Sequence, residues 1–294
     1  QMCIRDSIST IYTEGVLLPS SKLVGLRDAL DLVRNGDEIT ISGMTFFRNP
    51  VHFITSLIVS GKKDLSFVDR EPGFGLDVLA ASGVLKRIRA AMATFEHFGL
   101  APSVRRAAES GEVTYIEDTC GAVIAGLRAG AQGVPFVPVR GIIGSDLVKL
   151  HESIGTWKLI EDPFTGEKVV AVRSIEPDVA IIHVQVSDEF GNALIMGPRY
   201  EDELKIRASK RVILTAERVV DTDELKSMLK SLGAQLSATS LYVTAVVKLS
   251  GGAWPTGVYG LYEPDYNAIR EYYEYARMGK AMEWVRLNLA QRWS

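Results

Sequence analysis

The feature that most constrains this chain is a repeated alternation of short apolar runs with segments of helical periodicity. A helix between two short buried strands is typical of a right-handed βαβ crossover, and repeated crossovers build a parallel sheet covered on both faces. We therefore predict an α/β fold: an open, mostly parallel sheet with helices on both faces. The expected strands of the first half are residues 38–42, 65–68, 86–92, 113–116 and 134–139.

The first unit of this pattern shows how strand, loop and helix follow one another. Ser21 is predicted to cap a helix that ends at Asn35-Gly36. The strand at 38–42 then leads into a loop at residues 43–50, and Pro50 suits the first turn of the next helix.

The second half departs from this rhythm. Residues 156–161 and 167–173 flank an Asp-Pro-Phe-Thr-Gly turn, which predicts a hairpin that projects from the sheet. Residues 178–184 form the most strand-like run, and a terminal helical stretch follows Pro264. With no proline- or serine-rich linker, residues 21–294 are predicted to form one continuous domain. Residues 1–20 match nothing downstream and are predicted to be an N-terminal extension outside the fold.

Composition excludes several classes of function. Of the 294 residues, 47% are apolar and 23% charged, and the formal net charge of -3 offers no basic footprint for nucleic acid. No run approaches the roughly 20 apolar residues of a membrane span, so we expect no membrane partner. Two cysteines are too few for a disulfide framework or a thiolate metal cluster, which favours a reducing cytoplasm.

The common motifs of catalysis are missing. There is no phosphate-binding G-x-x-x-x-G-K-[ST], no H-E-x-x-H and no G-x-S-x-G. Residues 71–77 contain G-x-G before a helix, but a turn that feeds the helix explains them better than a dinucleotide site. The four scattered histidines share no ligand spacing, so no metal is predicted. His183 suits a satisfied core histidine as well as a functional one, and Cys120 suits a buried thiol better than a nucleophile.

Two loops at the predicted carboxyl ends of strands contain polar groups that packing alone does not require. Residues 43–50 offer backbone N–H groups at a helix start beside Arg48, which suits a phosphate or a carboxylate. Glu117 and Asp118 lie where open parallel sheets place ligands, although acidic residues at a helix start are also ordinary caps.

Several longer blocks of sequence accompany these loops. The most specific block is PDVAIIHVQ at 177–185, continued by SDEFGN at 187–192. Further blocks are SGMTFFRNP at 42–50, LRAGAQGVPFVP at 127–138 and GGAWPT at 251–256. Together they resemble the α-subunit branch of the class I CoA-transferases, which includes glutaconate CoA-transferase and related ring-opening hydrolases. Ser42 and Met44 depart from the family's G-G-aromatic pattern.

The resemblance implies the α subunit of a heteromeric acyl-CoA:carboxylate CoA-transferase. In this family a glutamate carboxylate attacks an acyl-CoA, and the exchange proceeds by ping-pong through a glutamyl-CoA thioester. That glutamate usually belongs to the second subunit, and no segment here matches its loop. We thus expect a β-subunit partner in a hetero-oligomer, acyl-CoA and a carboxylic acid as substrates, and no permanently bound cofactor.

Site residues follow from the same resemblance. The oxyanion and acyl-binding wall is assigned to Gly43, Met44, Thr45, Phe46 and Phe47, with Arg48 orienting an acyl carboxylate or a CoA phosphate. For Arg48, pairing with a local acid is an equal alternative.

Two other functions stay open. One is a CoA-dependent hydrolase that opens a ring in steroid catabolism, in which a glutamate of this subunit takes part; Glu117 and Glu96 are the candidates, although each alone suits a structural role better. The other is a noncatalytic ligand-binding subunit on a similar α/β scaffold.

Overall fold

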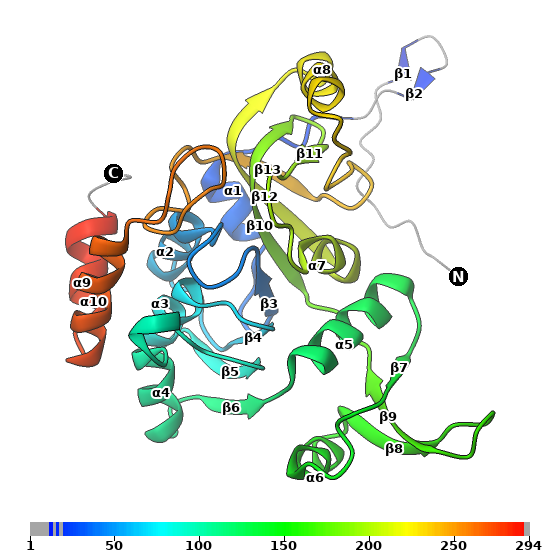
Figure 1. The fold of residues 1–294 in the computed structure, drawn as a ribbon. Coiled ribbons are helices and arrows are strands. Elements are labelled where there is room, and N and C mark those ends of the chain that lie inside the picture. The colour runs from blue at the N-terminus through cyan, green and yellow to red at the C-terminus, as the bar shows by residue number, and fades with distance from the viewer. Residues whose placement is uncertain (1–11, 14–15, 18–19, 291–294) are drawn as a thin grey trace.

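The computed structural model describes residues 12–13, 16–17 and 20–290. A seven-stranded parallel sheet runs through the molecule in the order β13-β12-β10-β3-β4-β5-β6, and a short strand, β11, pairs antiparallel with β10 (Figure 1). The predicted mostly parallel sheet is confirmed. Its strands are β3 (Glu38–Ile41), β4 (Leu65–Asp69), β5 (Leu85–Ala90), β6 (Thr114–Glu117), β10 (Val179–Asp188), β11 (Ala193–Leu194), β12 (Arg211–Val220) and β13 (Ala245–Lys248).

Helices cover both faces of this sheet, as predicted (Figure 1). Adjacent residues of one strand show the division: Phe67 packs in the large core that includes α2, α3 and α9, whereas Val68 packs in a smaller core with Val123 of α5. The helices are α1 (Leu26–Asp31), α2 (Val51–Val59), α3 (Phe74–Ala81), α4 (Pro102–Glu109), α5 (Cys120–Gln132), α6 (Asp146–Ser153), α7 (Asp202–Ala208), α8 (Thr222–Leu232), α9 (Tyr266–Arg277) and α10 (Ala281–Val285), with a 3₁₀-helix, η1 (Glu96–Phe98), and a π-helix, η2 (Arg286–Ala290).

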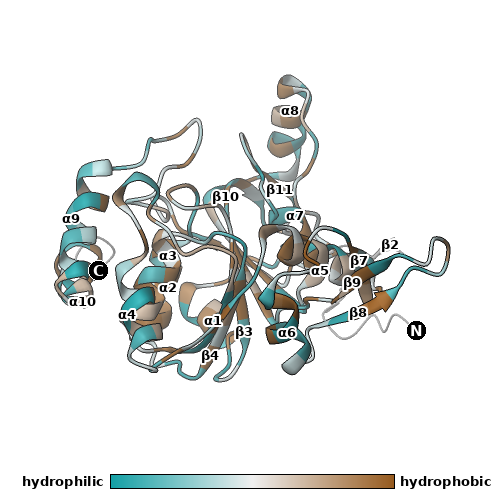
Figure 2. Ribbon diagram, turned by 60° about the horizontal axis from the view of Figure 1, so that its bottom comes forward, coloured by the Kyte–Doolittle hydropathy of each residue, from teal (hydrophilic) through white to brown (hydrophobic). Residues whose placement is uncertain are grey.

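A second, three-stranded antiparallel sheet lies apart from the parallel one (Figures 1 and 2). Its order is β7-β9-β8, formed by β7 (Phe136–Val139), β8 (Trp157–Glu161) and β9 (Lys168–Arg173). The predicted hairpin is confirmed, but it belongs to this sheet. The prediction that residues 134–139 extend the parallel sheet is wrong: β7 is an edge strand of the antiparallel sheet, which suits Pro138 because proline cannot donate to a central ladder.

The start of the first helix differs from the prediction. Ser21 does not cap it, because α1 begins at Leu26 after Gly25. The residues before Gly25 run along the sheet instead: the amide of Lys22 donates to the carbonyl of Glu189, and that of Val24 donates to the carbonyl of Val246.

The N-terminal extension falls mostly outside the described residues. Within it, β1 (Tyr12–Thr13) pairs with β2 (Val16–Leu17). The division into an extension at 1–20 and a single domain at 21–294 stays a prediction.

Candidate active site

The sheet changes its direction of growth between β3 and β10. Strands β4, β5 and β6 follow on one side of β3, while β10, β12 and β13 follow on the other. In open α/β sheets, ligands bind at the carboxyl edge beside such a switch point. Residues 43–49, here called the signature loop, leave β3 at this point and lead into α2 (Figure 1).

The signature loop has a strained backbone. Gly43 has a φ of 82°, and a Cβ atom there would lie 1.9 Å from the carbonyl oxygen of Phe47, so only glycine fits. Five non-glycine residues of the described chain have positive φ, and four of them are at this edge: Thr45, Arg48, Glu96 and Tyr200. Strain of this kind costs about 1–3 kcal/mol per residue and persists only where surrounding contacts enforce it.

Those contacts engage the loop's own amides. The amide of Gly43 donates to Asp202 Oδ1 (3.1 Å), that of Thr45 to the carbonyl of Glu71 (3.2 Å), and that of Arg48 to the carbonyl of Gly257 (2.8 Å). The amides of Met44 and Phe47 donate to each other's carbonyls. To stabilise an oxyanion, these N–H groups would have to leave their present acceptors. The geometry therefore supports a rigid wall more than a set of free donors.

Arg48 holds the loop in place. Only 2% of its side chain is exposed, and its Nη2 lies 2.6 Å from Asp202 Oδ2 on α7. The same nitrogen donates to the carbonyl of Pro198 (2.9 Å), while Nη1 donates to that of His183 on β10 (3.2 Å). Of the two roles left open by the sequence, the structure favours pairing with an acid, and that acid is distant in sequence. A ligand would reach the guanidinium only after these contacts break.

A second buried ion pair lies one helical turn further along α7. Lys205 is fully buried, and its Nζ lies 2.8 Å from Asp69 Oδ1 and donates to the carbonyl of Ile41 (2.7 Å). Burial raises the pKa of Asp69, and Lys205 opposes that shift. The two residues fasten α7 to the carboxyl ends of β3 and β4.

A cluster of charged side chains surrounds Arg70, directly after β4. Its Nε lies 2.8 Å from Glu201 Oε1, its Nη1 lies 3.4 Å from Glu71 Oε2, and its Nη2 donates to the sulfur of Met44 (2.9 Å). Burial and then the neighbouring Glu96 raise the pKa of Glu71. The cluster places carboxyl groups and one guanidinium against the signature loop.

The two predicted glutamates lie on neighbouring strand ends. Glu96 is exposed in η1, after β5, and its Oε1 accepts a hydrogen bond from Thr45 Oγ1 (3.1 Å). Glu117 is exposed at the end of β6, where its backbone pairs with Ala90. The structure joins Glu96, but not Glu117, directly to the signature loop by a hydrogen bond among its described contacts. Cys120 is half-buried at the start of α5.

Several residues of the site were missed from the sequence. Arg70 and Glu71 follow a strand, which was a usable signal for the carboxyl edge. Glu201, Asp202 and Lys205 gave none, because charged residues in a helix's first turns are usually exposed.

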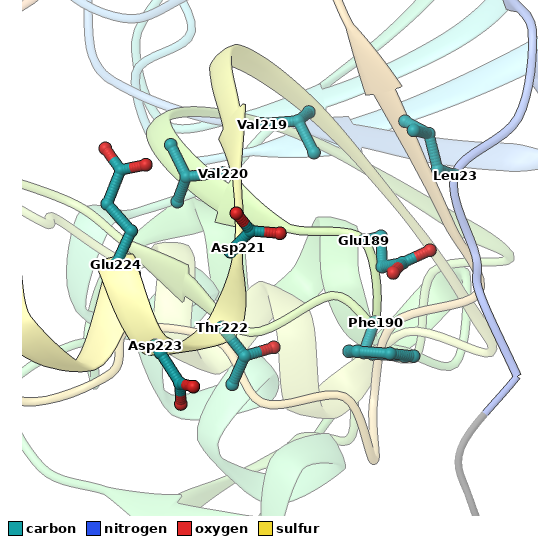
Figure 3. A pocket seen from close by; sticks show the side chains of 9 residues that line it. All are labelled: Leu23, Glu189, Phe190, Val219, Val220, Asp221, Thr222, Asp223 and Glu224. Atoms are coloured by element: carbon teal, nitrogen blue, oxygen red, sulfur yellow. The ribbon is translucent and has the colours of Figure 1, made fainter.

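A separate cavity of about 790 Å³ lies near the start of α8 (Figure 3). Carboxyl groups dominate it: Glu189, Asp221, Asp223 and Glu224 are among the lining residues, which include no basic side chain. An anionic ligand would be repelled there. This cavity is therefore unsuited to a phosphate or carboxylate compound.

Two findings concern only the described part of the chain. It contains no group of three or more His, Cys, Asp or Glu residues placed to hold a metal ion. None of its helices is long and apolar enough to cross a membrane.

Comparison with known proteins bears on this site. Residues 25–231 match the family described as coenzyme A transferase. A 3-oxoadipate CoA-transferase subunit of Pseudomonas knackmussii is 34% identical over 249 residues, covering 83% of this chain and 85% of that protein. The cholesterol ring-cleaving hydrolase subunit of Mycobacterium tuberculosis is 30% identical over 263 residues, covering 87% and 88%. An uncharacterised protein of Archaeoglobus fulgidus is 34% identical, but the chain spans about half of its length (53%).

Two solved structures share the fold. Glutaconate coenzyme A-transferase from Acidaminococcus fermentans superposes with a TM-score of 0.83 at 27% identity, covering 90% of this chain and 86% of that one. A variant of the decarboxylase AibA/AibB also gives a TM-score of 0.83, at 28% identity, covering 93% and 100%. The family match, the sequence identity to named relatives and the shared fold agree. The chain therefore belongs to the coenzyme A transferase family.

Proposed function

We propose that this chain is the α subunit of a heteromeric acyl-CoA:carboxylate CoA-transferase whose attacking glutamate lies on a β subunit. The observation that carries the proposal is the strained signature loop at the switch point of the sheet, held by hydrogen bonds from the amides of Gly43, Thr45 and Arg48. Relatives named as CoA-transferase subunits support it. The cytoplasmic location expected from the two cysteines is part of the same proposal.

The proposed reaction exchanges CoA between two acids. The partner's glutamate attacks the thioester carbonyl. The CoA thiolate departs, and an acyl-glutamyl anhydride is formed. The thiolate then attacks the glutamyl carbonyl, which releases the first acid and forms the glutamyl-CoA thioester. A second carboxylate reverses these steps and departs as the new acyl-CoA.

The residues of this chain position the reacting acyl groups. A carboxylate is a weak nucleophile in water, so both acyl groups must be held near attack geometry, which can contribute about 7–11 kcal/mol. Phe46 is buried, and its ring lies against Phe95, Phe98 and Tyr266 at centroid distances of 5.5, 6.1 and 6.2 Å, so the wall carrying it is rigid. Arg48 acts by holding this wall.

The test is CoA exchange by the assembled complex. The chain is co-expressed with a candidate β subunit encoded beside it, and acyl-CoA is mixed with a second acid. We expect exchange by the complex and none by this chain alone. Exchange at the same rate without a β subunit would reject the proposal.

A specific contact favours hydrolysis as a second candidate function. Glu96 accepts a hydrogen bond from Thr45 Oγ1 of the signature loop, which places a carboxyl group of this chain against the proposed acyl-binding wall, where hydrolysis needs a general acid or base. The relative named as a ring-cleaving hydrolase gives this candidate a precedent.

The need for a second carboxylic acid distinguishes CoA transfer from hydrolysis. Thioester loss that requires a second acid indicates transfer, whereas loss that ignores the acceptor indicates hydrolysis. Glu96→Gln should abolish hydrolysis and leave transfer largely intact, and Glu109→Gln, which removes an exposed carboxylate paired with Arg105, is the control. A complex that binds acyl-CoA and yields no glutamyl-CoA adduct on borohydride trapping, with no thioester loss, would be a noncatalytic binding complex.

A further inference from the structure

A buried polar network crosses the sheet behind the signature loop. His183, on β10, is fully buried; its Nδ1 lies 2.9 Å from Thr215 Oγ1 and its Nε2 lies 2.9 Å from Glu217 Oε1, both on β12. Burying a carboxylate is costly unless it is paired and hydrogen-bonded. A network of this kind needs every partner in place.

Glu217 extends the network to residues 250–262, here called the closing loop. Its Oε2 accepts from the amide of Gly251 (2.6 Å), its Oε1 accepts from the hydroxyl of Tyr262 (2.5 Å), and its backbone carbonyl accepts from Ser250 Oγ (2.8 Å). Burial raises the pKa of Glu217, but the hydrogen bonds from His183, Tyr262 and Gly251 outweigh it and hold that pKa below its ordinary value. One carboxylate thus binds both ends of the closing loop.

The closing loop in turn holds the signature loop. The amide of Arg48 donates to the carbonyl of Gly257, and the amide of Gly257 donates to the carbonyl of Phe46, both at 2.8 Å. The amide of Asn49 donates to Thr256 Oγ1 (3.2 Å). The middle of the closing loop is therefore paired edge to edge with the signature loop.

His183 also reaches the signature loop directly through its backbone. Its amide donates to Ser42 Oγ (2.8 Å), whose hydroxyl donates to the carbonyl of Arg48 (2.6 Å), and its carbonyl accepts from Arg48 Nη1 (3.2 Å). The ring of His183 therefore meets Glu217 while its backbone meets the signature loop.

We propose that Glu217 is a positioning residue that couples the two loops and so sets the acyl-binding wall at Phe46–Arg48. Glu217 does not touch the wall; it acts through Gly251 and Tyr262 on one side and through His183 on the other. The inference deepens the proposed transferase function, because the wall it sets belongs to that function's site.

The first test measures backbone hydrogen exchange in the full chain and needs no activity. In Glu217→Gln, amides of residues 43–49 should exchange about tenfold faster, the order expected when a hydrogen bond to a charged group is lost. Amides of β4 and β5 should keep their rates. The control is Glu224→Gln, which removes an exposed carboxylate paired with Arg218 and should leave residues 43–49 unchanged. Equal rates at 43–49 in both variants, or a rise spread evenly over the sheet, would overturn the coupling.

The second test uses the assembled complex. Tyr262→Phe keeps the ring and removes one donor to Glu217, so kcat should fall about tenfold with KM for both substrates changed less than twofold. Glu217→Asp, which keeps the charge, should recover part of the activity that Glu217→Gln loses. Unchanged kcat in Tyr262→Phe, or no recovery in Glu217→Asp, contradicts the positioning role. If the unmodified complex does not transfer CoA, the proposed function is wrong. The hydrogen-exchange rates of residues 43–49 still test whether Glu217 couples the two loops.

Discussion

The signature-loop edge and the antiparallel sheet with α6 use charged side chains in opposite ways. At the edge, the ion pairs Arg48–Asp202 and Lys205–Asp69 are almost wholly buried. In the antiparallel region, Arg140 pairs with Glu167 in solvent (3.3 Å), and large apolar side chains are exposed, including Phe136 at 45% and Phe164 at 94%. Of these two regions of the chain, the signature-loop edge holds its charged side chains in buried ion pairs, whereas the antiparallel region leaves them in solvent.

Rigidity in this chain is concentrated at the signature-loop edge. A buried ion pair rarely adds net stability over apolar packing, but breaking one leaves an unpaired charge in a poor solvent. Exposed pairs contribute little, because water and salt screen them. Buried pairs around residues 43–49 therefore indicate a loop whose exact position matters, which is what orientation of two acyl groups requires.

Removing Asp202 should have the largest effect. Asp202→Ala leaves Arg48 buried without its carboxylate and takes an acceptor from Gly43, so the free energy of unfolding should fall by about 3–5 kcal/mol. Urea denaturation measures the loss. Arg140→Ala, in the antiparallel region, should leave stability unchanged within error, and equal losses in the two variants would remove the contrast. If Asp202→Ala does not fold, Asp202→Asn should fold with a smaller loss in the same direction.

A glycine pair tests the strain of the signature loop. Gly43→Ala should lower the free energy of unfolding by about 1–3 kcal/mol more than Gly36→Ala, because overlap with the carbonyl of Phe47 adds to the strain. Gly36 is a matched control: it has a φ of 84°, close to the 82° of Gly43, but no heavy atom lies within 4 Å of its Cβ position. Thermal or urea denaturation of both variants gives the difference. Equal losses would show that the loop moves freely.

The smallest effect concerns pH. Burial, and then His183, lower the pKa of His52 on α2 from 6.5 to about 4. The unfolded chain therefore takes up a proton at this residue before the folded chain does, so stability is lost as pH falls from 6.5 toward 4. In His52→Gln, unfolding free energies measured across this range should vary less with pH than in the unmodified chain. An equal pH slope in both proteins would assign the dependence to other groups.

How far the sequence could predict the molecule depends on the range of the contacts. The parallel sheet follows from hydrophobic periodicity, which is local, and the strand ends at 42–43 and 117–118 marked the correct edge. The partners of the signature loop are not local: Arg48 and Asp202 are 154 residues apart. Only the folded structure shows that the charged residues Asp202 and Lys205 of α7 are buried.

The antiparallel sheet shows a second limit of sequence reasoning. Its strand β7 looked like one more member of the parallel series, and α6 was not predicted. Residues of β7 alternate between exposed and half-buried, whereas β10 is buried throughout, and Pro138 was the local sign of an edge strand. Strand identity was therefore predictable, whereas its sheet was not.

The position of the covalent intermediate decides whether the attacking carboxylate comes from a second chain. The assembled complex is mixed with acyl-CoA, trapped with borohydride and digested, and the modified glutamate is identified by mass spectrometry. We expect the modification in a β-subunit peptide. A modification on Glu96, Glu117 or any other glutamate of this chain would contradict it.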